Sequence, residues 1–272
     1  MPTLWVLGSS FAVAHRSDDN YIYMVAEGLG LELAGYALGG SSIPYMCIQQ
    51  WPKIRDRIGN GDIVLVALAT PQRTYFISEY PTISSLSDIS PSATQSMRRK
   101  SDNISKEEKS AIFDYYLYLH SDLLNLSWLQ SWFYELNHVC IERGAAAVVL
   151  DGKASDADGD KFGNTTDIDS SACRSIIRGY GHLYDISQAE AVDTASAQWL
   201  IEHDDFRMNH IGIQNHKVLA NKIISSVRDG VQLDLTTGFY TKYIDQKYFK
   251  SVDWLQQHTT WPPYCNIEGV WP

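Results

Sequence analysis

Short apolar runs alternate with segments of helical period along most of this chain. Residues 4–7, 63–68 and 145–150 contain apolar side chains only, as is typical of strands buried on both faces of a parallel sheet. Residues 31–38 and 182–186 predict two further strands. The pattern therefore indicates a sheet whose central strands are covered on both sides.

Helical period and end signals mark the segments between these strands. Gly30 follows the first helical segment, Pro44 lies in the first turn of the second, and Gly144 ends the longest one, which we expect to break near Asn125. The pattern predicts helices over residues 21–29, 44–57, 105–143, 189–201 and 213–227. Strands alternating with helices predict a three-layer α/β/α sandwich with a mostly parallel sheet.

The domain organisation follows from the same pattern. Residues 1–228 are predicted to form one domain, from which residues 74–104 depart as an irregular surface excursion and residues 152–170 as a polar loop. Residues 229–272 are rich in aromatic side chains without a clear period. We expect this extension to pack on the domain or on a protein partner, because Trp and Tyr are enriched at interfaces.

Charge and composition narrow the classes of partner. The chain has 272 residues and a net charge of −10, which argues against a nucleic acid or an anionic membrane surface as the main partner. No basic residue precedes the first apolar run, and no stretch approaches about 20 apolar residues, so neither a signal peptide nor a membrane span is predicted. The sequence predicts a soluble, cytoplasmic protein.

Metal-binding patterns are weak. The four cysteines are far apart and form no Cys-x-x-Cys pair, so we expect reduced thiols and no zinc site. Residues 156–164 read DADGDKFGN, but the glycine and the terminal acid of a calcium loop are not at the required positions. We expect no metal and no organic cofactor.

Candidate chemistry gathers after the strands. In an open parallel sheet the ligand site lies beyond the carboxyl ends of the strands. That rule places Ser10, Gly40, Thr70 and Asp151 along one edge. A serine there becomes a nucleophile only with a histidine to take its proton, a carboxylate to orient the histidine and donors for the oxyanion.

A late segment offers the histidine and the carboxylate. Residues 203–223 read HDDFRMNHIGIQNHKVLANKI, in which Asp204 and Asp205 precede His210 and a helical run follows. From spacing alone, this segment is either a base with its orienting carboxylate or a solvated loop. His216 is expected to pack in the core or against a helix rather than to act as a base.

Four motifs taken together resemble the SGNH (GDSL-like) hydrolases. They are WVLGSSF, YALGGSS, GDIVLVALATPQR and MNHIGIQNHKVLANKI, in the order in which that family carries its conserved blocks. The resemblance implies a flavodoxin-like sheet and a serine esterase. It implies Ser10 as nucleophile, His210 as base and Gly40 as a backbone donor to the oxyanion.

The chain departs from the family at two places. Ala69 and Thr70 stand where the family has an oxyanion-binding Asn, so either Thr70 replaces that donor or the site has fewer donors. Arg207 stands three residues before His210 in place of the family's Asp. We therefore expect Asp205 to orient the histidine, with Asp204 as the alternative.

The substrate prediction rests on the resemblance. It implies a carboxylic ester, with an O-acetyl group on a carbohydrate as the expected case, and Arg73 either binds a substrate anion or forms a structural ion pair. The variant motifs resemble a bacteriophage branch of the family, which implies a virion-associated location. The alternative is a weak or inactive hydrolase-like domain that serves as a structural or receptor-binding part of a larger assembly.

Overall fold

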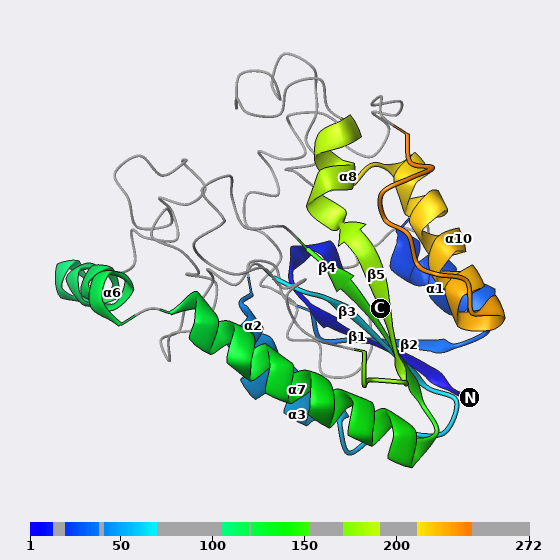
Figure 1. Ribbon diagram of the computed structural model, residues 1–272, viewed down its shortest axis with the longest axis horizontal. Coiled ribbons are helices and arrows are strands. Elements are labelled where there is room, and N and C mark those ends of the chain that lie inside the picture. Colours follow the sequence, from blue (N-terminus) through cyan, green and yellow to red (C-terminus); the bar gives the residue numbers. More distant parts are fainter. Residues whose placement is uncertain are drawn as a thin grey trace.

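A computed structural model describes the parts of the chain that build a sheet and its covering helices (Figure 1). The described residues are 1–12, 20–37, 41–69, 105–119, 121–152, 171–190 and 211–240. The strands among them are β1 (Thr3–Gly8), β2 (Glu32–Gly35), β3 (Ile63–Ala67), β4 (Ala146–Asp151) and β5 (Ile176–His182). The main helices are α1 (Tyr21–Leu29), α6 (Lys106–Tyr118), α7 (Asp122–Arg143), α8 (Leu183–Glu190) and α10 (Ile213–Asp229).

The described strands form one parallel sheet in the order β2-β1-β3-β4-β5. The register pairs Gly8 with Ala67 and Ala67 with Leu150, so β1, β3 and β4 end together. The strand order reverses between β1 and β3, which is where open α/β sheets bind ligands. The predicted fold class, an α/β/α sandwich with a parallel sheet, is confirmed.

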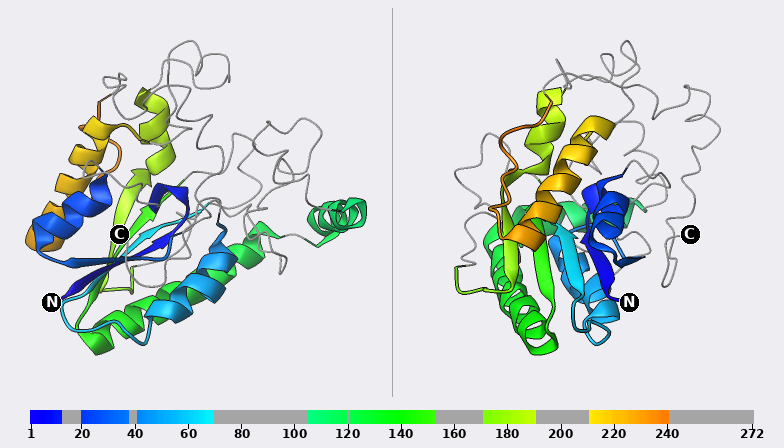
Figure 2. Two further views of the ribbon diagram at one scale, coloured as in Figure 1. Left: turned by 180° about the vertical axis from the view of Figure 1, so that it is seen from behind. Right: turned by 90° about the vertical axis from the view of Figure 1, so that its right-hand side faces the viewer.

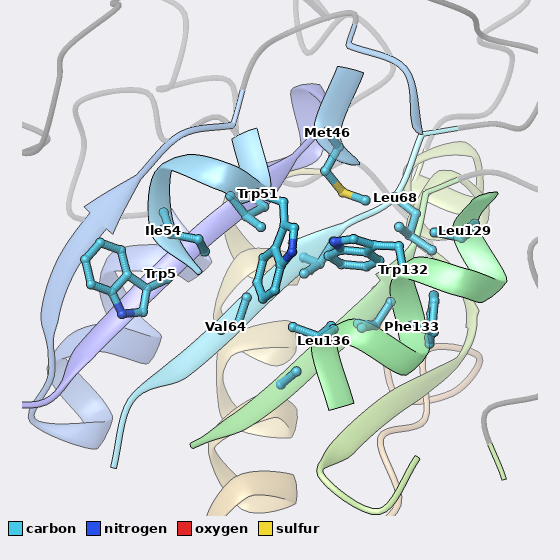
Figure 3. Close-up of a cluster of buried hydrophobic side chains, with 14 of the residues drawn as sticks. Trp5, Met46, Trp51, Ile54, Val64, Leu68, Leu129, Trp132, Phe133 and Leu136 are labelled. Atoms are coloured by element: carbon cyan, nitrogen blue, oxygen red, sulfur yellow. The ribbon is translucent and has the colours of Figure 1, made fainter. Parts of the chain in front are cut away.

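Alternate strand residues pack on opposite faces and build two cores. Trp5, Val64 and Val149 face a core shared with α7 and with a helical segment at residues 43–54, and Trp51 meets Trp132 edge-on there (Figure 3). Leu4, Leu65 and Val148 face the second core, shared with α1, α8 and α10. Both layers are visible in Figure 2. Strands buried on both faces explain the purely apolar runs of the sequence.

Glycines end α1 and α7 as the sequence predicts, and a polar side chain caps the start of each helix. The Asn20 side chain accepts the Ile22 N–H, and Ser121 accepts the Leu124 N–H at the start of α7. Gly30 and Gly144 close these helices in the left-handed conformation. The predicted break in the longest helical segment is present, but it lies four residues before Asn125, because Ser121 caps the start of α7.

The fifth strand and the second helix also differ from their predictions. Residues 182–186 were expected as a strand, but β5 ends at His182 and α8 starts at Leu183. The segment expected as one helix over residues 44–57 is α2 (Ile43–Tyr45), one π-helical turn η2 (Met46–Gln50) and α3 (Trp51–Ile54). No helix in the described parts of the chain combines the length and apolarity that crossing a membrane requires.

Residues beyond α10 return to the sheet. Asp234 forms a bridge with Tyr180 of β5, and the Tyr180 N–H donates to the Leu233 carbonyl. Leu233 and Leu235 are buried in the second core. Residues 229–240 therefore contribute to the packing of the described body, although they lie outside the domain boundary expected at residue 228.

Candidate functional site

A sharp turn at the carboxyl end of β1 carries the serine predicted as nucleophile. β1 ends at Gly8, Ser9 is buried, and Ser10 begins a short 3₁₀ turn, η1 (Ser10–Ala12). The Ala12 N–H donates to the Ser9 carbonyl at 2.9 Å and closes the turn. The Ser10 N–H lies at the start of this turn, where backbone N–H groups in general lack a partner within the helix.

Gly8 is the residue that allows this turn. Its φ is 120°, which L side chains rarely adopt, and a Cβ built there would lie 2.0 Å from the Ala67 carbonyl oxygen. The Ser9 N–H donates to the same carbonyl at 2.9 Å. The backbone of β1 therefore contacts the backbone of β3 at Gly8 and Ser9, the two residues before Ser10.

The opposite side of Gly8 is held by two buried side chains. The Gly8 N–H donates to Gln50 Oε1 at 2.7 Å, and Gln50 Nε2 donates back to the Gly8 carbonyl at 3.1 Å. Ser41 Oγ donates to the same carbonyl at 2.8 Å. Ser41 belongs to the YALGGSS motif, so this contact joins two of the motifs that carry the family resemblance.

A second connection runs from α10 to the turn through Tyr21. The Tyr21 N–H donates to His216 Nδ1 at 3.3 Å, and the two rings stack with centroids 5.6 Å apart. The Tyr21 hydroxyl donates to the Phe11 carbonyl at 2.9 Å, one residue beyond Ser10. One side chain therefore spans the distance between the first half of α10 and η1. His216 packs against α1, as the sequence predicted.

The end of β4 carries a structural ion pair. Asp151 is fully buried, and Arg178 of β5 donates to both of its carboxylate oxygens at 3.2 Å. Two parallel bonds of this kind fix the geometry of both partners. Asp151 therefore lies at the same edge of the sheet as Ser10, as the sequence predicted, and its carboxylate is occupied by Arg178.

A further histidine lies at the end of β5 and was not singled out from the sequence. His182 Nδ1 lies 3.1 Å from Asp185 Oδ2, a pairing of ring and carboxylate. β5 is three strands from β1, which corresponds to about 14 Å at the usual spacing. This pair is therefore too far across the sheet to take a proton from Ser10.

Two of the described thiols, Cys47 and Cys140, are poor alternative nucleophiles. Burial raises the pKa of Cys47 to about 12, with a further contribution from the negative charge of Glu135. Burial alone raises the pKa of Cys140 to about 12. Thiolate is the reactive form of cysteine, so neither thiol is reactive near neutral pH.

Several predicted site residues fall outside the described ranges. The backbone of Ser10 is described, and its position at the end of β1 agrees with the prediction. The residues outside the described ranges are Gly40, Thr70, Arg73, Asp204, Asp205 and His210. Their flanking residues Ser41, Ala69 and Ile211 are all buried. Within the described ranges, no three His, Cys, Asp or Glu side chains are grouped to hold a metal ion.

Comparison with known proteins gives structural neighbours at low similarity. No family model matches the sequence, and no curated protein does. One solved structure is a carbohydrate esterase whose active site displays divergent catalytic and non-catalytic binding functions, at 10% identity, TM-score 0.39 and 84% coverage of this chain. Another is a family 2 carbohydrate esterase with a carbohydrate binding domain from Corynascus thermopiles (Myceliophthora fergusii), at 9% identity, TM-score 0.38 and 83% coverage.

A protein from Bacillus subtilis is also similar, at 10% identity, TM-score 0.31 and 85% coverage of this chain. The matched regions span 65%, 66% and 51% of the carbohydrate esterase, the Corynascus enzyme and the Bacillus protein. The chain thus corresponds to less than two thirds of each neighbour's length. The class that the fold itself defines is the α/β/α sandwich with a strand-end turn at its switch point.

Proposed function

We propose that this protein is a serine ester hydrolase with Ser10 as its nucleophile. His210 is the general base, Asp205 orients it, and the N–H groups of Ser10 and Gly40 bind the oxyanion. Thr70 stands where the family's Asn would donate, and Arg73 is assigned to substrate binding. The ester is an O-acetyl group on a carbohydrate, an assignment that rests on the sequence resemblance.

The observation that carries the proposal is the placement of Ser10. It directly follows the strand at which the sheet order reverses, on a turn where Gly8 permits close contact with β3. The Tyr21 bridge supports the assignment of His210, because it links His216 of α10 to the Phe11 carbonyl, one residue beyond Ser10. The segment that leads into α10 contains His210 and Asp205.

The chemistry follows from these roles. His210 accepts the Ser10 proton as the Ser10 oxygen attacks the ester carbonyl, and the N–H donors stabilise the negative oxygen of the tetrahedral intermediate. Collapse of the intermediate breaks the bond to the alcohol, which takes the proton from His210. Water then attacks the acyl-serine with His210 again as base, and the acid leaves.

Hydrolysis of a chromogenic acetyl ester tests the proposal. Ser10→Ala is expected to lower kcat by about 10,000-fold or more, because it removes the oxygen that forms the acyl intermediate. Ser9→Ala is the matched control, since it removes the adjacent hydroxyl and leaves the nucleophile. Equal hydrolysis by wild type and Ser10→Ala, with both proteins folded, would contradict the proposal.

A serine-reactive phosphonate separates the enzyme from its non-catalytic alternative. Stoichiometric labelling at Ser10 is expected for the hydrolase. A folded protein that takes up no label would instead favour a hydrolase-like domain with a structural or receptor-binding role. This alternative is retained because the stretch at Ala69 and Thr70 contains no Asn, where the family carries an oxyanion-binding Asn.

A further inference from the structure

The side of β1 that faces β2 loses its strand partner just before the serine turn. In a parallel sheet, residues two apart direct their N–H and C=O groups to the same side. The Val6 carbonyl accepts the Tyr36 N–H on that side, and β2 has already ended at Gly35. Gly8 therefore presents a buried N–H and C=O where no strand is available.

Gln50 takes the place of the missing strand. Its amide accepts the Gly8 N–H and donates to the Gly8 carbonyl, as a neighbouring peptide group would. Gln50 is 2% exposed and Ser41 0%, so water does not compete for these bonds. With Ser41 as the second donor, the Gly8 carbonyl has both of its lone pairs bonded.

These bonds fix the peptide that precedes the nucleophile. The Gly8 carbonyl points toward Gln50 and Ser41, and the Ser9 N–H of the same trans peptide points the opposite way, to Ala67. A rigid Gly8–Ser9 peptide sets the direction in which the backbone enters Ser10.

We infer that Gln50 and Ser41 are positioning residues of the hydrolytic site, which hold the Gly8–Ser9 peptide so that Ser10 is aligned for attack. The inference rests on the proposed function of Ser10. Neither residue touches the substrate, and both act through the backbone of the turn. Small misplacements of reacting groups are costly, and an error of about 1 Å lowers rates by about 100-fold.

Labelling kinetics with the phosphonate test the inference. Gln50→Met, which keeps the length and removes both bonds, is expected to lower the labelling rate at saturating phosphonate by about 10- to 100-fold. Ser41→Ala is expected to have a smaller effect, because Gln50 still donates to the Gly8 carbonyl. Asn137→Leu is the control. Asn137 accepts the Ser175 N–H at the amino-terminal end of β5, and this variant should label at the wild-type rate.

Gln50→Glu adds a pH profile that a merely structural role would not produce. A protonated carboxyl donates and accepts like the amide, whereas the ionised form only accepts and repels the Gly8 carbonyl. The ratio of the variant's labelling rate to that of wild type should therefore rise as pH falls. A ratio that stays near one at every pH, with Gln50→Met also at the wild-type rate, would overturn the inference.

Hydrogen exchange of residues 5–12 separates this inference from the proposed function. If wild type labels and folded Gln50→Met labels more slowly with faster exchange in this segment, both are supported. If wild type takes up no label, the hydrolase function fails and the positioning role in catalysis fails with it. Faster exchange in Gln50→Met would then still identify Gln50 as the clamp of the turn, and unchanged exchange would remove that role too.

Discussion

Gly8 is a residue at which β1 and β3 approach each other closely, since no space for a side chain remains between Gly8 and Ala67. Gly8→Ala is expected to lower the free energy of unfolding by about 3 kcal/mol or more, because the new Cβ meets the Ala67 carbonyl at a positive φ. Urea denaturation measures the change. Gly30→Ala is the control, since Gly30 also has a positive φ but nothing within 4 Å of a Cβ. It should cost about 1–2 kcal/mol. Equal losses for the two variants would show that the close approach is not the cause.

Asp62 holds together the amino-terminal ends of elements at the opposite edge of the sheet. Its carboxylate accepts the Thr3 N–H at 2.7 Å, the Trp5 indole N–H at 2.8 Å and the Gly59 N–H at 2.8 Å. Asp62→Ala is expected to cost about 2–4 kcal/mol, because it leaves buried donors unbonded. The phosphonate labelling rate of the folded protein should stay unchanged, since the serine turn lies at the other end of β1. A large fall in labelling would mean that the two edges are coupled.

The segment after α10 depends on an acidic residue whose pKa is lowered. Thr236 donates to Asp234 through its hydroxyl and its N–H, and these bonds, with one from Thr237, hold the pKa of Asp234 near 2. A lowered folded-state pKa means that the stabilisation is full above the unfolded-state pKa near 4 and is lost as pH falls to about 2. The Asp234 side chain is 33% exposed, and solvent screening limits the stabilisation to about 1 kcal/mol at most.

Thermal unfolding of Asp234→Ala across pH checks this sign. The variant should be less stable than wild type at pH 6, and the difference should shrink between pH 4 and pH 2. A difference that persists undiminished at pH 2 would show that the carboxylate charge is not what the threonines recognise.

The elements that the sequence predicted well are those with a local cause. β1, β3 and β4 are continuous apolar runs because both faces of each are buried, and Gly30 and Gly144 end helices by a conformation that favours glycine. β5 reads IIRGYGH, with two glycines and an Arg that pairs across to Asp151, so no two-residue alternation marks it. The Gln50 clamp joins residues 42 positions apart and leaves no local pattern to find.

At the scale of the whole molecule, the body of the fold extends past the end of the last described helix. Leu233 and Leu235 are 1% and 2% exposed in the core with α10. A chain ending at residue 228 should be less stable than one ending at residue 240 by about 4 kcal/mol or more, because it removes two buried leucines. Comparing the two truncations isolates residues 229–240. Equal midpoints in urea would place the boundary at residue 228.

One part of the candidate site could be predicted from a local sequence pattern, and another part forms only when distant segments meet in the fold. Ser10 was predicted from a strand followed by glycine, and the described backbone places it at the switch point. The supports of that turn come from Ser41, Gln50 and Ala67, which meet it only once the sheet has formed. The roles of Asp205 and His210 stay predictions, to be decided by the ester and phosphonate experiments.

The close approaches at the end of β3 have a consequence for how this protein can diverge. A Cβ built on Gly8 would lie 2.0 Å from the Ala67 carbonyl oxygen. A Cβ built on Gly152, on the β4 side, would lie 2.0 Å from the Leu68 carbonyl oxygen. Main chain therefore packs directly on main chain on both sides of the end of β3, and Ser10 follows Gly8 by two residues. Mutational libraries aimed at new specificity should therefore keep both glycines.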